Sequence, residues 1–160
     1  MQLHEYTSFD GLGLAQLLRE GDVSSTELHD AAMRACAAVN PRINAVVELW
    51  PADLSVIDKA APFAGVPFLI KDVAVTMAGQ RSEAGSRLGA GHVAQADSHL
   101  MTQFRQAGLV TFGRTSTPEM AFATTTEPVL YGATRNPWNL ALSAGDTSST
   151  WWPRLCSRRT

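Results

Sequence analysis

Lys71, one of only two lysines in the chain, stands where it could act as a base. It ends the apolar run Val66-Pro-Phe-Leu-Ile70 and is followed directly by Asp72. Burial at the end of such a run disfavours the charged ammonium, and a neutral amine can take a proton from a hydroxyl group. The alternative is a strand-end lysine that reaches solvent or pairs with Asp72. The segment by itself favours this alternative.

Hydroxyl groups are concentrated in two segments further along the chain, residues 113–120 and 124–139. The first reads Gly-Arg-Thr-Ser-Thr-Pro-Glu-Met, and the second contains Thr-Thr-Thr-Glu and then Tyr-Gly-Ala-Thr-Arg-Asn-Pro-Trp-Asn. Periodicity assigns no chemistry to either segment, and both are compatible with ordered surface loops in which Ser and Thr side chains cap and turn the backbone. Long stretches that lack regular structure are more often functional than idle.

Two helices are expected before these segments. Residues 8–21 open on Ser and Asp, carry leucines at helical spacing and close on glycine, which predicts a short helix. Residues 24–27 fit a capping box, so a second helix is expected over about 26–39. Asn40-Pro41 is expected to end it, because proline cannot continue a helix. Cys36 in this helix is interpreted as a small buried hydrophobe.

Short apolar runs alternate with these helices. Residues 44–50, 65–72 and 109–112 are predicted to be strands, and residues 98–107 a helix that packs on the sheet they form. The strand, helix, strand order also predicts that 65–72 and 109–112 are neighbours. The fold class is therefore α/β.

Composition limits the function classes that fit. Hydrophobic residues make up 45% and charged residues 18% of the 160 residues, as in one globular domain. The net charge of -2 gives no basic surface for nucleic acid. The start lacks the features of a signal peptide, and no apolar run is long enough for a membrane span, so the cytoplasm is expected. Cys36 and Cys156 are far apart, and no disulfide is expected.

Three motifs together resemble the amidase-signature family. They are Gly65-Val-Pro-Phe-Leu-Ile-Lys-Asp72, then Gly-Arg-Thr-Ser-Thr-Pro-Glu119, then Thr-Thr-Glu127 leading into Tyr131-Gly-x-Thr-Arg-Asn-Pro-Trp-Asn139. Ser24-Ser-Thr-Glu-Leu and Asn40-Pro-x-Ile-Asn-Ala45 are also similar to the N-terminal helices of that family. The resemblance covers about residues 5–145.

The resemblance implies both a fold and a reaction. Members of the family have an α/β/α fold in which helices cover a mixed β-sheet, and this chain would hold its N-terminal part. They cleave carboxamides through a Ser-Ser-Lys triad that needs no cofactor and no metal. The family's catalytic lysine falls on Lys71, which acts through a relay serine held by a cis peptide, and the relay serine activates the nucleophilic serine. A small carboxamide is the implied substrate, without nucleic acid or membrane partners, and a homodimer stays open.

The relay serine is where this sequence departs from the family. In place of the family's Gly-Gly-Ser-Ser-Gly-Gly, residues 143–152 read Ser-Ala-Gly-Asp-Thr-Ser-Ser-Thr-Trp-Trp. A register shifted by one residue places the serine pair on Ser148 and Ser149, but the glycines that permit positive φ and close backbone approach are missing. The family's nucleophile would fall beyond Thr160. The chain as printed is therefore expected to be inactive.

The last fifteen residues break with the composition of the rest. Residues 146–160 hold two of the four tryptophans and one of the two cysteines, but no Gly or Ala. Trp151-Trp152 can be encoded only by TGGTGG, in which a one-base shift gives Gly-Gly. We therefore interpret 1–145 as a partial amidase domain and 146–160 as an out-of-frame or disordered tail. An evolved C-terminus is the alternative.

Two other functions stay open at this point. The chain could be a non-catalytic remnant of an amidase fold. It could also be similar to the A-type subunit of a glutamine amidotransferase, which releases ammonia from glutamine for transfer to mischarged tRNA and requires partner subunits.

Overall fold

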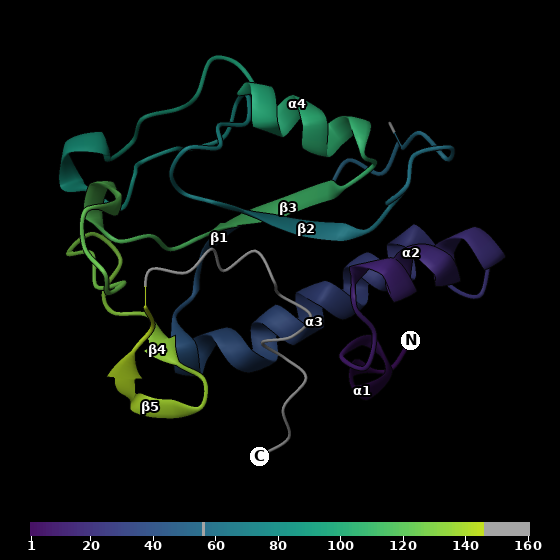
Figure 1. Ribbon diagram of the computed structural model, residues 1–160, viewed down its shortest axis with the longest axis horizontal. Helices are drawn as coiled ribbons and strands as arrows, with labels where there is room; N and C mark the ends of the chain where they lie inside the picture. The colour runs from purple at the N-terminus through teal and green to yellow at the C-terminus, as the bar shows by residue number, and fades with distance from the viewer. Residues whose placement is uncertain (56, 146–160) are drawn as a thin grey trace.

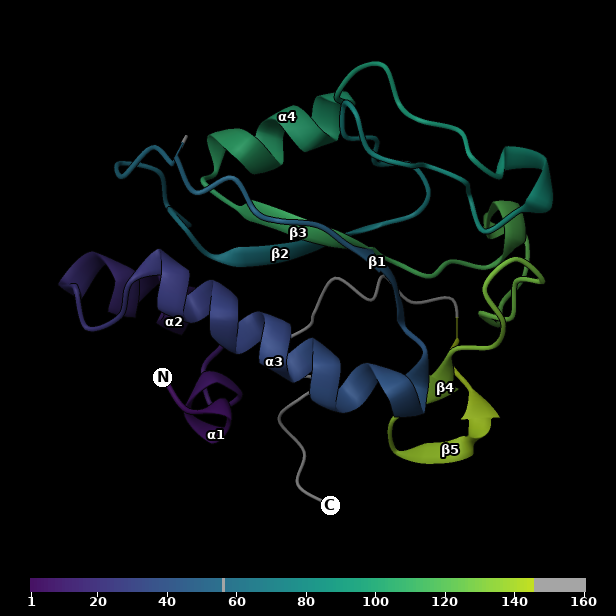
Figure 2. The same ribbon diagram turned by 180° about the vertical axis from the view of Figure 1, so that it is seen from behind.

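The structure is a computed structural model that describes residues 1–55 and 57–145. A short sheet lies between helix α4 on one face and helices α2 and α3 on the other (Figures 1 and 2). The elements in chain order are α1 (Leu3–Tyr6), α2 (Gly11–Glu20), α3 (Ser25–Ile43), β1 (Val46–Leu49), β2 (Pro67–Lys71), the 3₁₀ turn η1 (Arg87–Gly89), α4 (His99–Gln106), β3 (Val110–Thr115), the 3₁₀ turn η2 (Glu119–Ala121), β4 (Arg135–Asn136) and β5 (Asn139–Ser143). The expected α/β class is confirmed.

The sheet is mixed and has the strand order β1-β3-β2. Strand β2 runs parallel to β3, with Pro67 opposite Val110 and Lys71 opposite Thr115. Strand β1 runs antiparallel to β3 on the other side. The prediction that residues 65–72 and 109–112 form neighbouring strands is confirmed, as is the helix between them.

The two faces of the sheet pack against different helices because successive residues of a strand point to opposite sides. Leu69 belongs to the larger core cluster, which includes Leu28 of α3 and Phe112 of β3. Ile70, the next residue, packs with Met101 of α4 on the other face. Consecutive buried apolar residues in β2 thus reflect a strand that is covered on both sides.

Helix α3 begins as the sequence predicts. The Ser24 Oγ accepts a hydrogen bond from the Glu27 backbone N–H at 3.2 Å, and the Glu27 carboxylate accepts one from the Ser24 N–H at 3.0 Å. The capping box is therefore confirmed. Cys36 is buried on this helix, as expected for a small hydrophobe.

The expected end of this helix at Asn40-Pro41 is wrong. Helix α3 continues through Pro41 to Ile43. Proline in the last turn removes few helical hydrogen bonds, and the chain turns only after Asn44, whose φ of 51° is left-handed. The Asn40 Oδ1 fixes this turn, because it accepts hydrogen bonds at 2.8 Å from the two backbone N–H groups that lead into β1.

Strands β4 and β5 form a separate two-stranded antiparallel sheet near the C-terminal end of α3 (Figure 1). The Asn44 side chain joins this region to the helix by donating to the carbonyls of Tyr131 and Ala133. Within the ranges given above, no helix has both the length and the apolar character needed to cross a bilayer.

Candidate active site

Lys71 lies at the edge of the sheet where β2 and β3 both end. The two strands are parallel, so their C-terminal ends bring Lys71 and the hydroxyl side chains of residues 115–117 to the same edge. The backbone N–H of Asp72 donates to the Thr115 carbonyl at 3.1 Å and extends the pairing by one residue. Lys71 is half-buried at a strand end, not on an exposed loop. Ligands of open α/β sheets bind beyond this edge.

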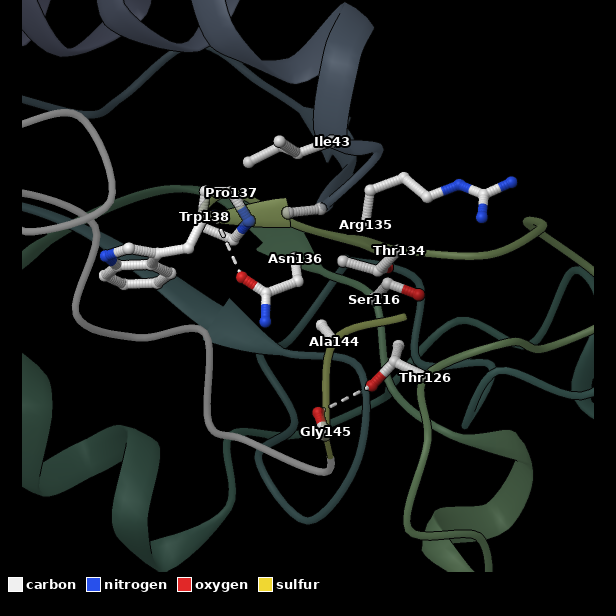
Figure 3. A pocket seen from close by; sticks show the side chains of 11 residues that line it. Ile43, Ser116, Thr126, Thr134, Arg135, Asn136, Pro137, Trp138, Ala144 and Gly145 are labelled. Carbon is white, nitrogen blue, oxygen red and sulfur yellow. Dashed lines mark hydrogen bonds between the residues drawn. The ribbon is translucent and has the colours of Figure 1, made fainter. Parts of the chain in front are cut away.

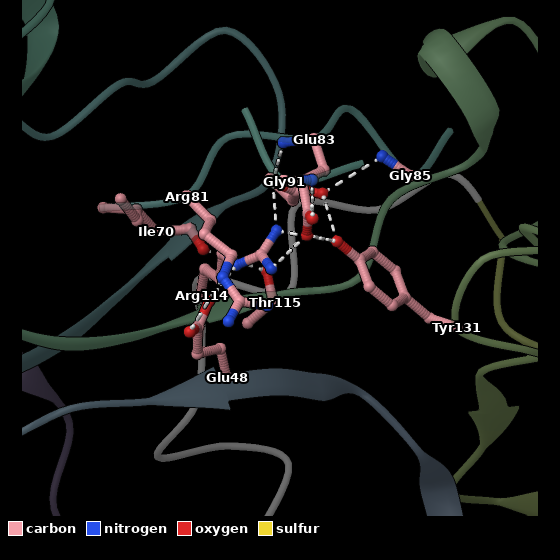
Figure 4. Close-up of polar contacts among 10 residues, drawn as sticks. Glu48, Ile70, Arg81, Glu83, Gly85, Gly91, Arg114, Thr115 and Tyr131 are labelled. Atoms are coloured by element: carbon pink, nitrogen blue, oxygen red, sulfur yellow. Dashed lines mark hydrogen bonds and ion pairs between the residues drawn. The ribbon is translucent and has the colours of Figure 1, made fainter. Parts of the chain in front are cut away.

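A buried guanidinium, that of Arg114, stands directly beside this strand end (Figure 4). Its Nε donates to Glu48 at 2.8 Å, its Nη1 donates to Asp72 at 2.6 Å, and its Nη2 donates to Glu83. Its Nη1 also donates to the Tyr131 hydroxyl at 2.8 Å, and the guanidinium lies 5.4 Å from the centre of that ring. One buried cation therefore faces three carboxylates, of which Asp72 and Glu83 are buried and Glu48 is partly exposed.

Each partner of Arg114 comes from a different part of the chain. Glu48 lies on β1, Asp72 directly follows β2, and Glu83 lies in the loop after it. The Asp72 carboxylate also accepts hydrogen bonds from the backbone N–H groups of Glu83 at 2.8 Å and Gly85 at 3.0 Å. Tyr131 adds the loop between η2 and β4. We call Arg114 with these four partners the Arg114 cluster.

Three groups of the Arg114 cluster, Glu83, Tyr131 and Arg114, have pKa values shifted by their surroundings. Burial raises the pKa of Glu83, but hydrogen bonds from the Gly91 N–H, the Tyr131 hydroxyl and Arg114 outweigh it and lower that pKa to about 2. Burial and the hydrogen bond to Glu83 raise the pKa of Tyr131, which stays a neutral donor. Burial lowers the pKa of Arg114, but its carboxylate partners outweigh this and raise it above its ordinary value.

Sequence reasoning missed the Arg114 cluster. It considered Asp72 only as a partner for Lys71, whereas the structure pairs the Asp72 carboxylate with Arg114. A signal was present, because Arg114 is the only charged residue of strand β3, in a chain in which only 18% of residues are charged. A buried arginine requires acidic partners, although spacing alone does not say which ones.

A pocket of about 140 Å³ opens beside the same edge, next to Gly145 (Figure 3). Its apolar lining includes Ile43 and Trp138, and its polar lining includes Ser116 and Thr126. The Thr126 hydroxyl donates to the Gly145 carbonyl at 3.2 Å and so holds the last described residue against the pocket.

Ser116 and Thr117 follow β3 and are both buried. Their hydroxyl groups have no hydrogen-bond partner among residues 1–55 and 57–145. The same holds for the Thr111 hydroxyl and the His29 Nδ1, so the feature is not confined to this edge of the sheet.

Ser148 and Ser149, with the rest of the segment 146–160, lie outside the described residues. Within the described part of the chain, no group of three or more His, Cys, Asp or Glu side chains could hold a metal ion.

The sequence model of the amidase family matches residues 27–149. The chain therefore belongs to the amidase family, and the family expected from the three motifs is confirmed. The matched range contains Lys71 and the whole Arg114 cluster.

Two curated relatives and one solved structure illustrate the family. The 6-aminohexanoate-cyclic-dimer hydrolase of Paenarthrobacter ureafaciens is 41% identical over 149 residues, which cover 87% of this chain and 29% of the relative. The A-type subunit of the glutamyl-tRNA(Gln) amidotransferase of Geobacter sulfurreducens is 32% identical over 159 residues, which cover 93% of this chain and 32% of the relative. A structure of 6-aminohexanoate cyclic dimer hydrolase complexed with substrate superposes with a TM-score of 0.80 and 38% identity, covering 89% of this chain and 30% of that one.

The chain spans about 30% of the length of these relatives. It corresponds to an N-terminal portion of an amidase, with the mixed sheet and helices of that part of the fold.

Proposed function

We propose that the parent of this chain hydrolyses carboxamide C–N bonds, with Lys71 as the base and with Ser148 or Ser149 as the position of the relay hydroxyl. The observation that carries the proposal is the place of Lys71. It stands at the C-terminal edge of the parallel β2 and β3 pair, inside the range matched by the amidase family.

The chemistry assigned to Lys71 is proton transfer. The Lys71 Nζ takes the proton of the relay hydroxyl, which takes the proton of the nucleophilic serine as the serine oxygen attacks the amide carbonyl. The proton then passes to the leaving nitrogen as the C–N bond breaks, and water hydrolyses the acyl ester.

The Arg114 cluster supports this assignment, because a catalytic base must be held within a fraction of an ångström. Asp72, next to Lys71, accepts two backbone N–H groups and the Arg114 guanidinium. The backbone that carries Lys71 is thereby fixed to β3 and to the loop at residues 83–85.

For the chain as printed we propose no turnover. Residues 146–150 read Asp-Thr-Ser-Ser-Thr, without the glycines that shape the relay loop in the family. Simple aliphatic and aromatic amides, and the cyclic dimer of 6-aminohexanoate named for the relatives, should therefore be left uncleaved. Turnover that is lost on Lys71→Ala would show that a hydroxyl in the tail serves as nucleophile, and would contradict this point.

Glutamine is the second candidate substrate. The 32% identity to the A-type amidotransferase subunit favours it. The test uses the protein obtained when the reading frame after Gly145 is restored. Its release of ammonia from glutamine is compared with its cleavage of the cyclic dimer. Activity on glutamine alone, raised by partner subunits, would favour the amidotransferase.

A further inference from the structure

Another pocket, of about 210 Å³, lies at the start of β3 beside the C-terminal end of α4. Its described lining comes from the segment after β1, from α4 and from the residues that lead into β3. Thr115, at the far end of β3, pairs with Lys71, so the length of the strand separates this pocket from the Lys71 edge. Pockets for drug-sized ligands usually measure about 300–1,000 Å³, so this one suits a smaller molecule. We call it the Asp53 pocket; its lining includes Asp53, Ile57, Met77, Arg105, Leu109 and Thr111.

Asp53 gives the pocket an exposed carboxylate. Its Oδ1 accepts hydrogen bonds from the Ser55 hydroxyl at 2.6 Å and from the Ser55 backbone N–H at 2.9 Å. These bonds, together with the positive charge of Arg105, lower the pKa of Asp53, so the group is an anion at neutral pH. Both bonds use Oδ1, which leaves Oδ2 available to a ligand.

The other charged side chain of the lining, Arg105, is already paired. Its Nε donates to the Asp97 carboxylate at 2.6 Å, and Asp97 also accepts the Ala78 backbone N–H at 2.7 Å. The charges of Asp53, Asp97 and Arg105 therefore sum to -1. This balance repels an anion and attracts a cation.

Thr111 adds a buried hydroxyl to the lining. Thr111 lies opposite Phe68 in the sheet, and Phe68 packs on Phe104 of α4, so Thr111 faces the α4 side. The residue is 6% exposed, and its hydroxyl has no hydrogen-bond partner among residues 1–55 and 57–145. Buried hydroxyls are normally satisfied, so a ligand with N–H donors fits this place.

We propose that the Asp53 pocket binds a primary alkylammonium ion. Its ammonium group donates to the Asp53 carboxylate and to the Thr111 hydroxyl, and its short alkyl chain packs against the apolar side chains of the lining. An ammonium offers three donors and no acceptor, which matches two acceptor groups in a pocket of net negative charge. The inference does not rest on the proposed function, because it uses neither Lys71 nor turnover.

The test titrates the isotope-labelled 160-residue chain with n-butylammonium chloride at neutral pH and constant ionic strength. Backbone amide shifts are followed by NMR, and the dispersion of each spectrum shows that the protein is folded. Saturable shifts are expected at residues 105–111. Sodium butyrate, which has the opposite charge on a similar chain, is titrated in parallel and should give no saturable shift there. Saturable binding of butyrate without binding of butylammonium overturns the proposal.

Two aspartates of the same segment provide a matched pair of variants. Asp53→Asn should weaken butylammonium binding by about threefold or more, because it removes the charge but keeps an Oδ1 acceptor for Ser55. Asp58→Asn is the control, since Asp58 likewise accepts the backbone N–H two residues on, that of Ala60, at 2.9 Å but does not line the pocket. Its affinity should be unchanged. Equal affinities for the two variants overturn the proposal.

Arg105→Met decides the sign of the ligand charge. It removes the guanidinium and makes the pocket more negative, so butylammonium binding should tighten by about twofold or more. Butylammonium binding that is lost in this folded variant would contradict an ammonium site. Thr111→Val should weaken binding, because the buried acceptor is removed while the size of the side chain is nearly kept. Unchanged affinity in Thr111→Val overturns the role given to that hydroxyl.

Discussion

Removing the guanidinium of Arg114 should strongly destabilise the chain. The Arg114 side chain is 2% exposed, and its partners Asp72 and Glu83 are 0% and 5% exposed. Arg114→Met leaves these two carboxylates buried without a cation, which costs about 3–5 kcal/mol in comparable buried pairs. Domains of this kind have about 5–15 kcal/mol of stability in total, so this is a large fraction of it.

A surface arginine provides the matched control. Arg105 donates to Asp97 at 2.6 Å, but their side chains are 42% and 22% exposed. Exposed pairs contribute about 0–1 kcal/mol, so Arg105→Met should change little. Both variants are compared by urea unfolding followed by circular dichroism at neutral pH. Equal, small losses for the two variants would refute the central place given to the Arg114 cluster.

A combined variant keeps the test decisive if Arg114→Met does not fold. Adding Asp72→Asn and Glu83→Gln to Arg114→Met removes the two buried carboxylate charges that lose their cation, while Glu48 keeps its ion pair with Arg81. The combined variant should be more stable than Arg114→Met alone, because buried ion pairs can be replaced by neutral groups at little cost. A combined variant less stable than the single one would contradict the electrostatic explanation.

Three further predictions concern stability. Gly113→Ala should lower the free energy of unfolding by about 1–3 kcal/mol, because a Cβ there would lie 2.5 Å from the Glu48 carbonyl oxygen. Gly11→Ala is the control in the same urea assay and should be tolerated, because nothing lies within 4 Å of the added Cβ. The pKa of Glu83 is about 2 in the folded chain against an ordinary 4.5. Stability on the order of 3 kcal/mol is therefore present above pH 4.5 and lost as the pH falls toward 2. Glu83→Gln should flatten the acid side of the plot of unfolding free energy against pH. Burial lowers the pKa of His29, so the unfolded chain binds the proton more readily and stability falls as the pH drops below 6.5; unfolding of His29→Leu should lack this dependence.

The sequence predicted the elements whose signals are local. The Ser24 capping box, the apolar run into Lys71 and the helix before β3 each follow from residues close together in the chain, and each was confirmed. The sequence analysis placed the end of α3 too early, because it assumed that Pro41 stops the helix. The Asn40 side chain accepts hydrogen bonds from backbone N–H groups beyond the helix, and the local signal of a proline does not predict these contacts.

Only the part of the site that lies in a recognised family motif was predicted from the sequence. Lys71 lies at the expected strand end, but its catalytic role and those of Ser148 and Ser149 remain predictions. The Arg114 cluster joins residues from 48 to 131, so its contacts depend on strand register and loop closure. The amidase resemblance identified several of these segments as motifs without saying which side chains meet.

The most direct test of the proposed function begins with the gene and its downstream flank. The frame after Gly145 is restored, and hydrolysis of carboxamides is measured for the resulting protein, for Lys71→Ala, and for Lys59→Ala, in which the only other lysine of the chain is replaced. The proposal predicts turnover that falls by about a hundredfold to ten-thousandfold on Lys71→Ala and is unchanged on Lys59→Ala, with all three proteins folded. A restored enzyme that keeps full turnover without Lys71, or a flank that encodes no glycine-rich serine loop in any frame, would contradict it.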